Sequence, residues 1–278
     1  MTQQYATLTQ RIITHALLII GLIISIFPFY WMMVMASNTT SNVYHIPPQL
    51  ILGGQLWVNI SHVLQNIPFL QNFLNTVFVA AVVTMLVLFF CSIAGFTFAK
   101  FEFPGKNILF VILLGTIILP TGGALVASYV IQANLGWIGG FLPLIVPSAV
   151  TAFGIFWMRQ MSLSSIHSEL VDAAKIDGCG HLRLYWHVAV PALRPALGFL
   201  GLLTFIGTWN DYLWPLIVLT DPKIQTLQVA LAQLFGVYNT DISMVMAGTL
   251  LSTVPLIIIF FLGVRQFIGN ISAGALKF

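Results

Sequence analysis

The sequence contains very little charge. Of its 278 residues, 10 are Lys or Arg and 7 are Asp or Glu, so 6 % are charged, whereas a soluble globular domain carries about 25 %. Hydrophobic residues make up 59 % of the chain, and the mean hydropathy is +0.98. Because the polar side chains are too few to cover a core of this size in water, the composition excludes a soluble fold. Lipid must surround much of the chain, which makes it an integral membrane protein.

Several kinds of chemistry lack the residues that they require. The two cysteines, Cys91 and Cys179, fall in an apolar span and in a polar loop, so we expect no disulfide bond between them. No two of the six histidines stand three or four positions apart, the spacing that places two ligands on one helical face, so we expect no metal site. No nucleophile, base and orienting acid can be assembled from the sequence, and we therefore predict no catalytic residues.

The sequence is rich in long apolar segments. Six stretches without Lys, Arg or Glu are long enough to cross a bilayer as helices, which takes about 20 residues. They run over 12–36, 72–99, 107–132, 138–158, 196–220 and 242–264. The first is longer than the roughly 7 to 15 apolar residues of a secretory signal, so we expect a retained helix. The predicted fold is all-α: a polytopic membrane protein with six transmembrane helices and a single transmembrane domain over 1–278.

The positions of Lys and Arg predict the orientation of the chain, because cytoplasmic loops collect basic residues. With the N-terminus inside, nine of the ten fall on the cytoplasmic side and only Lys223 falls outside. The first external loop, 37–71, has no charged residue. Both termini are therefore predicted to be cytoplasmic. The basic residues stand singly and form no stripe that could follow a phosphate backbone, so we expect no nucleic-acid partner.

The cytoplasmic loop between the fourth and fifth predicted spans, about 159–195, differs from the others. It holds three of the seven acids, Glu169, Asp172 and Asp177, and four of the ten basic residues. Residues 168–178 are typical of a short helix with Ser168 as its N-cap and Gly178 as a left-handed stop. A charged helix in this position is suited to meet a partner in water.

Two further patterns occur in this loop. Ala173 and Ala174 leave little side chain on one flank, which would let another surface approach closely. A second helix is predicted to lie along the membrane interface, because four apolar or aromatic residues recur at the helical period: Leu182, Tyr185, Trp186 and Ala189. Pro191 and Pro195 mark the turn into the fifth span.

The segment Asp172-Ala-Ala-Lys-Ile-Asp-Gly178, followed by Pro191, resembles the EAA loop of permease subunits from ATP-binding-cassette importers. Similar residues of the carbohydrate-uptake, maltose-type subfamily occur in the same order along nearly the whole chain. They are Asn75-Thr76, Lys100-Phe101, Phe103-Pro-Gly-Lys106, Leu119-Pro120, Trp209-Asn-Asp-Tyr-Leu-Trp-Pro-Leu216, Thr226-Leu227, Met246-Ala-Gly248 and Ser272-Ala-Gly-Ala-Leu-Lys277. The chain departs from the family pattern in three places: Asp172 stands where Glu is usual, His167 replaces a common Pro before Glu169, and Ala127-Ser-Tyr129 lacks the usual Ile-Pro-Leu-Tyr pattern.

This resemblance implies a division of labour between subunits. In the family the EAA loop is a coupling helix that docks on a separate ATPase subunit, and the matching residues here are Glu169, Asp172, Ala173, Ala174, Asp177 and Gly178. The chain has no Gly-x-x-x-x-Gly-Lys-[Ser/Thr] motif, so ATP and Mg²⁺ would be bound by the partner. The resemblance further implies a second homologous permease, a dimer of ATPase subunits, an extracytoplasmic solute-binding protein and a place in the bacterial inner membrane. Without the resemblance, this loop could equally be a solvated connector.

Asp211 is the only acid in a predicted span, within Trp209-Asn210-Asp211-Tyr212. A straight helix would carry it deep into the bilayer, where an ionisable group marks a transport pathway or a partner. Alternatively, Pro215 breaks the helix early and places Asp211 at the outer interface within an aromatic belt. These four residues are the candidate solute pathway, because amides and phenols can bind the hydroxyl groups of a sugar.

The resulting hypothesis is a permease subunit of an importer for a sugar or related polyol. Glycerol phosphate or an oligopeptide is the nearest alternative, although no Lys or Arg lies within the spans to bind a phosphate. An ion-coupled transporter or channel is a rival of another class, and it would need several buried acids or a polar filter. A membrane enzyme would need catalytic residues that the sequence does not supply.

Overall fold

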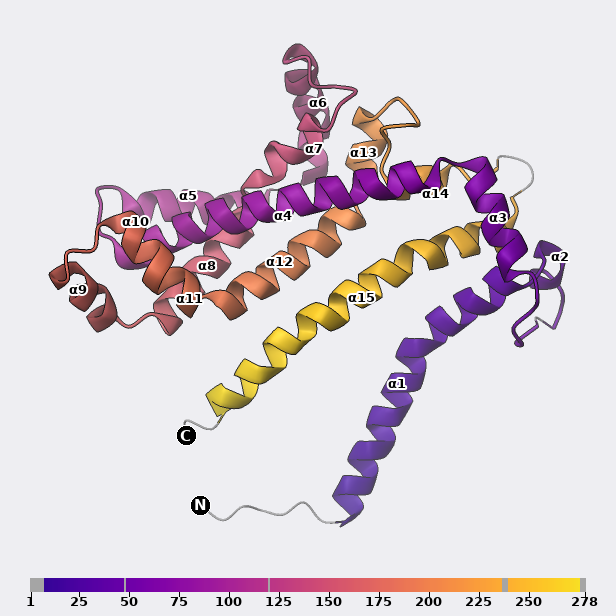
Figure 1. Ribbon diagram of the computed structural model, residues 1–278, viewed down its shortest axis with the longest axis horizontal. Helices are drawn as coiled ribbons and strands as arrows, with labels where there is room; N and C mark the ends of the chain where they lie inside the picture. Colours follow the sequence, from indigo (N-terminus) through magenta and orange to yellow (C-terminus); the bar gives the residue numbers. More distant parts are fainter. Residues whose placement is uncertain (1–7, 48, 120, 237–239, 276–278) are drawn as a thin grey trace. The chain divides into compact units, whose positions relative to one another are not determined.

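The computed structural model describes residues 8–47, 49–119, 121–236 and 240–275, without the side chains of 121 and 264–275. All regular structure in this part of the chain is helical, and none of it forms a strand (Figure 1). The all-α prediction is therefore confirmed. Both chain ends, for which cytoplasmic placement was predicted, lie outside the described residues, as do the motif residues Pro120, Leu276 and Lys277.

The chain folds as two compact units, Met1–Ile67 with Leu231–Thr253, and Pro68–Ala230 with Val254–Phe278. The first unit contains α1 (Leu8–Ser37), α2 (Thr40–Val43), α3 (Leu56–Asn66) and the beginning of α15 (Ile242–Ala275). The side chain of Asn59 joins α3 to the end of α1, because its Nδ2 donates to the carbonyl oxygens of Ala36 and Asn38 at 2.8 and 2.9 Å. The apolar side chains of α1 up to Phe29 are exposed, as expected of a helix that faces lipid or another subunit.

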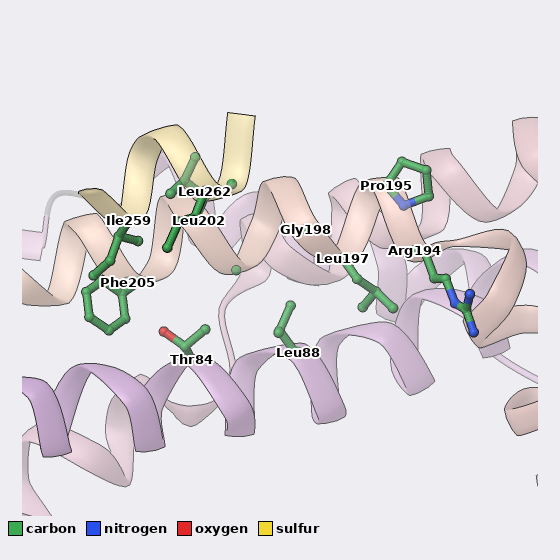
Figure 2. Close-up of a pocket in the computed structure, with 12 residues that line it drawn as sticks. Thr84, Leu88, Arg194, Pro195, Leu197, Gly198, Leu202, Phe205, Ile259 and Leu262 are labelled. Carbon is green, nitrogen blue, oxygen red and sulfur yellow. The ribbon is translucent and has the colours of Figure 1, made fainter. Parts of the chain in front are cut away.

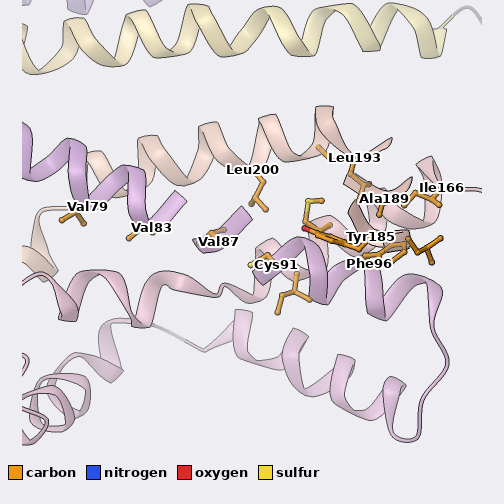
Figure 3. Close-up of a cluster of buried hydrophobic side chains, with 14 of the residues drawn as sticks. Val79, Val83, Val87, Cys91, Phe96, Ile166, Tyr185, Ala189, Leu193 and Leu200 are labelled. Carbon is orange, nitrogen blue, oxygen red and sulfur yellow. The ribbon is translucent and has the colours of Figure 1, made fainter. Parts of the chain in front are cut away.

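The second unit is built on three helices, α4 (Phe69–Lys100), α8 (Ala152–Ser165) and α12 (Arg194–Trp209). One face of α4 supplies Val79, Val83, Val87 and Cys91 to the core at the four-residue spacing of a helix (Figure 3). Small residues allow the helices to approach closely. A Cβ atom on Gly95 of α4 would lie 2.6 Å from the Cβ of Met158 on α8, which is the role of small residues at helix contacts in membranes.

The remaining elements of the second unit are short. They are α5 (Lys106–Ile118), η1 (Thr121–Ala124), α6 (Leu125–Asn134), α7 (Leu142–Ile145), η2 (Pro147–Ala149), α9 (Ser168–Ile176), α10 (His181–Leu184), η3 (Tyr185–Ala189), α11 (Val190–Ala192) and α13 (Leu213–Val218). A further helix, α14 (Leu227–Ala232), begins in this unit.

Four helical segments of the described chain are long and apolar enough to cross a membrane. The number is six if each of two bent helix pairs is one span; these pairs are 106–118 with 122–134 and 181–192 with 194–209. Three predicted spans are not continuous helices. The span 107–132 is broken between α5 and α6, and 196–220 between α12 and α13. The span 138–158 consists of α7, η2 and α8. Thr151 restarts the third by capping α8, where its Oγ1 accepts from the Gly154 N–H at 3.0 Å.

Candidate functional site

The predicted coupling segment is a helix, α9, that ends as expected but begins one residue earlier. His167 is the N-cap, with φ −71° and ψ 144°, and Ser168 is the first helical residue, so the prediction of Ser168 as N-cap is wrong. Gly178 has φ +77°, a left-handed conformation that glycine adopts without strain. The N–H groups of Gly178 and Cys179 donate to the carbonyl oxygens of Lys175 and Ala174 at 3.0 and 2.9 Å, which closes the helix as a C-terminal glycine motif does.

The two faces of α9 differ sharply. Val171 and Ala174 are buried in the core of the second unit. The acids Glu169, Asp172 and Asp177 are exposed. The expectation that both alanines form one open flank is therefore wrong, because Ala173 is exposed and Ala174 is buried. Their side chains point about 100° apart around the helix, so neighbours in sequence cannot share one face.

Apolar side chains accompany the acids on the exposed side of α9. Ile176 is 87 % exposed and Leu170 is 51 % exposed. Asp172 forms an ion pair with Lys175, with 3.3 Å between Asp172 Oδ1 and Lys175 Nζ. An exposed ion pair of this kind contributes little to stability. The surface therefore combines acidic and apolar groups without an evident role in holding the subunit together, which suits it to contact another protein.

A helical segment, His181–Ala192, connects α9 to α12 and meets α12 at an angle of 79°. It contains the π-helical turn η3, Tyr185–Ala189, which changes the helical register. Consequently the four residues predicted to form one interfacial face are divided. Leu182 and Trp186 are exposed, whereas Tyr185 and Ala189 are buried. The Tyr185 hydroxyl forms a 2.6 Å hydrogen bond with Ser92 of α4, and thereby anchors the segment to the core.

The candidate pathway residues lie at the end of α12 and do not converge on one point. Trp209 is fully buried, with its ring 5.6 Å from Phe73 and 5.8 Å from Phe205. Asn210 and Tyr212 are exposed. Asp211 is half-buried in the break between α12 and α13, so the straight helix through Asp211 is not formed. The break, residues 210–212, contains Asp211, and Pro215 lies within α13 rather than at the break.

Two cavities meet at Asp211. The first, which we call the threonine cavity, has a volume of about 460 Å³ and is lined on its polar side by Thr151, Thr204, Thr208 and Thr226 together with Ser148 and Asp211. The second, the glutamine cavity, is also about 460 Å³ and is lined by Gln132 and Ser128, again with Ser148 and Asp211. Among the described residues, neither cavity has a Lys or Arg in its lining.

A third hollow, a groove of about 820 Å³, runs between α4, α12 and α15 (Figure 2). Its lining is mostly aliphatic, including Leu88, Leu202 and Ile259. Arg194 stands at one end and is the only charged residue among the described residues that line it. The apolar wall offers few hydrogen-bonding groups to a polar solute.

A cluster on α4, in which Asn72 joins the motif residues Asn75 and Thr76, holds the loop beside the threonine cavity. Asn72 Nδ2 donates to the carbonyl oxygens of Pro222 and Gln225, both at 2.9 Å, and Asn75 Nδ2 donates to those of Lys223 and Gln225 at 2.8 and 3.0 Å. The Oγ1 of Thr76 accepts from the N–H of Leu227 at 2.7 Å. The signal was available in the sequence, since three polar residues at helical spacing in an apolar helix share one face.

These contacts also explain part of the motif series. Asn75-Thr76 and Thr226-Leu227 stand about 150 residues apart, and the hydrogen bonds of Asn75 and Thr76 bring the two motifs together. Within the described residues, no three His, Cys, Asp or Glu side chains gather as ligands of a metal ion would.

The sequence family described as binding-protein-dependent transport system inner membrane component matches residues 5–268. This chain belongs to that family. It is therefore an inner-membrane component of a binding-protein-dependent importer, and both the family resemblance and the predicted membrane localisation are confirmed.

Curated relatives cover nearly the whole length of this inner-membrane component. The lactose transport system permease protein LacG of Rhizobium radiobacter is 31 % identical over 257 residues, which are 92 % of this chain and 93 % of LacG. The sn-glycerol-3-phosphate transport system permease protein UgpE of Yersinia pestis is 30 % identical over 92 % of this chain and 94 % of UgpE. The arabinooligosaccharides transport system permease protein AraQ of Bacillus subtilis is 31 % identical over 74 % of this chain and 73 % of AraQ.

A solved structure shares the fold. One chain in the crystal structure of a bacterial ABC transporter involved in the import of the acidic polysaccharide alginate superimposes with a TM-score of 0.82, over 95 % of this chain and 99 % of that chain, at 22 % identity. Family membership leaves the ion-coupled transporter and the membrane enzyme without support.

Proposed function

We propose that this inner-membrane component is the permease subunit of an ATP-driven importer for a sugar or related polyol. In this proposal the chain forms one transmembrane permease domain with six spans and both termini in the cytoplasm. A second homologous permease, a dimer of ATPase subunits that binds ATP and Mg²⁺, and an extracytoplasmic solute-binding protein complete the importer. Named relatives that transport lactose and arabinooligosaccharides support the substrate class.

The structure of α9 is the observation that carries the coupling role. Its acids Glu169, Asp172 and Asp177 are exposed, its buried face is fixed in the core, and Gly178 ends it. The segment His181–Ala192 follows directly and leads into α12, whose far end borders the threonine cavity. A push on α9 by the ATPase could therefore be carried by packed helices to the solute pathway.

Glycerol phosphate is the second candidate substrate, because UgpE is a relative of similar identity. A phosphate site ordinarily contains Arg or Lys. The described lining residues of both cavities include neither Arg nor Lys, which favours a neutral solute over a phosphate ester.

Reconstitution with the partner subunits tests the coupling role. We expect Asp172→Arg to lower solute-stimulated ATPase activity by about fivefold or more, the range of a typical coupling free energy. Glu102→Arg is the matched control, since Glu102 is an exposed acid outside α9 that pairs only with Lys106. Gly178→Ala, which forces a side chain into φ +77°, should also uncouple, whereas Gly180→Ala has open space and φ −69° and should not. Undiminished stimulation in both test variants would refute the coupling role.

Labelling tests the orientation. A single cysteine at position 172, in a chain whose Cys91 and Cys179 are replaced by serine, should react with a membrane-impermeant maleimide in inside-out vesicles and not in intact spheroplasts. Reaction in spheroplasts would place α9 outside the cell and overturn the proposal.

A further inference from the structure

We infer that this chain itself contains a binding site for a neutral, polyhydroxylated solute where the threonine and glutamine cavities meet at Ser148 and Asp211. The inference rests on the proposed import function, and it assigns the solute contacts to this subunit rather than to its permease partner. The residues that line the two cavities also indicate which class of solute binds there.

The size and lining of the two cavities suit a sugar. Each has a volume of about 460 Å³, within the roughly 300 to 1,000 Å³ of small-molecule sites. Apolar walls such as Val79 and Phe153 in one cavity and Leu125 in the other can face the C–H groups of a sugar ring. Because Ser148 and Asp211 line both cavities, a solute bound at this junction reaches hydroxyl, amide and carboxylate groups together.

Two buried polar atoms in these linings lack a hydrogen-bond partner in the described structure. Thr226 is 3 % exposed and its Oγ1 is unpaired, and it lines the threonine cavity. Gln132 is 5 % exposed and its Oε1 is unpaired, and it lines the glutamine cavity. Buried polar groups are rarely left unpaired, because the loss of their hydrogen bonds to water is costly. The hydroxyl groups of a bound polyol would supply the missing partners on both sides of Asp211.

The surrounding structure fixes these groups in place before a solute arrives. Asn72 and Asn75 hold the loop that ends at Thr226. Trp214 Nε1 donates to the carbonyl oxygen of Pro143 at 3.0 Å, which ties α13 to α7 beside the glutamine cavity. A site held on rigid elements loses less entropy when it binds a ligand.

Charge selects among hydroxylated solutes. Asp211 is the one ionisable side chain among the residues that the structure describes in either lining. A carboxylate accepts hydrogen bonds from sugar hydroxyls but repels a phosphate group. The site should therefore bind a neutral sugar and reject sn-glycerol 3-phosphate.

Equilibrium dialysis of the purified importer without its binding protein tests the site, with radiolabelled lactose, arabinotriose and sn-glycerol 3-phosphate as probes. We expect one of the two sugars to bind and glycerol phosphate not to bind. Asp211→Asn and Thr226→Val should each weaken sugar binding about tenfold, the loss expected when a hydrogen bond to a buried group is removed. Asp221→Asn and Thr97→Val are matched controls outside both linings and should bind like the unmodified protein.

Uptake into proteoliposomes with the binding protein separates the possible failures. If none of the three probes is transported or stimulates ATP hydrolysis, the proposed function is wrong for these substrates. If a sugar is transported but neither Asp211→Asn nor Thr226→Val changes its binding or uptake, the solute site is not here, although the import function stands. Binding of glycerol phosphate in preference to both sugars would overturn the charge argument. The melting temperature of each variant in detergent identifies any variant that fails only because it does not fold.

Discussion

The contact between α4 and α8 depends on the absence of a side chain at Gly95. A Cβ atom built there would lie 2.6 Å from the Cβ of Met158 and 2.7 Å from the backbone nitrogen of Arg159. Neither neighbour is the end of a flexible side chain that could rotate away. Gly95→Ala therefore forces the two helices apart, and we expect it to destabilise the second unit.

The size of this effect follows from the kind of atoms that collide. Inserting a methyl group into a packed core costs about 1 to 3 kcal/mol, and the middle of this range, about 2 kcal/mol, is the cost expected for Gly95→Ala. Such a loss lowers the ratio of folded to unfolded protein by about 30-fold. Gly115→Ala in α5 is the matched control, because no atom lies within 4 Å of its Cβ position.

Thermal unfolding of the two variants in detergent, followed by size-exclusion chromatography, measures the difference. Gly95→Ala should lose its monodisperse peak at a clearly lower temperature than the unmodified protein, and Gly115→Ala should not. Equal melting temperatures for the two variants would show that α4 and α8 do not approach as described.

Three further predictions concern single contacts. Tyr185→Phe removes the hydrogen bond to Ser92 and should lower stability by about 1 kcal/mol, measured in the same thermal assay; a fully neutral substitution would contradict that contact. Asn72→Ala removes two hydrogen bonds to the loop 222–225, so limited proteolysis should cut this loop faster than in the unmodified protein, and an unchanged rate would mean that Asn72 does not hold it. In detergent, a maleimide should label the half-exposed Cys179 but not the buried Cys91, with two thiols labelled after denaturation in SDS; two labelled thiols in the folded protein would contradict this burial.

Composition and motif order predicted the class of the protein well, because both are properties of the sequence itself. The scarcity of charge required a membrane environment, and the ordered motif series pointed to the family that the chain belongs to. The helix α9 and its end at Gly178 were also predictable, since helix ends depend on a few neighbouring residues.

Side-chain direction was harder to predict where the helix changes its register. Leu182, Tyr185, Trp186 and Ala189 obey a regular helical period, yet the π-helical turn places two of them in the core and two at the surface. The break at Asp211 is a similar case, because the apolar pattern of the sequence continues across it. Pro215 was the only residue that indicated an interruption, and it lies within α13 and not at the break.

The sequence by itself determined that this chain is helical, lies in a membrane and carries an exposed acidic helix, because these properties depend on composition and on residues close together in the chain. Only the tertiary structure decided that Asp211, Ser148, Thr226 and Gln132 border two cavities that share Ser148 and Asp211 in their linings. These residues are separated by up to 94 positions in the chain, and hydrophobic patterning carries no information on which distant polar groups meet. Helix packing and the hydrogen bonds from α4 to the loop before Thr226 bring them together.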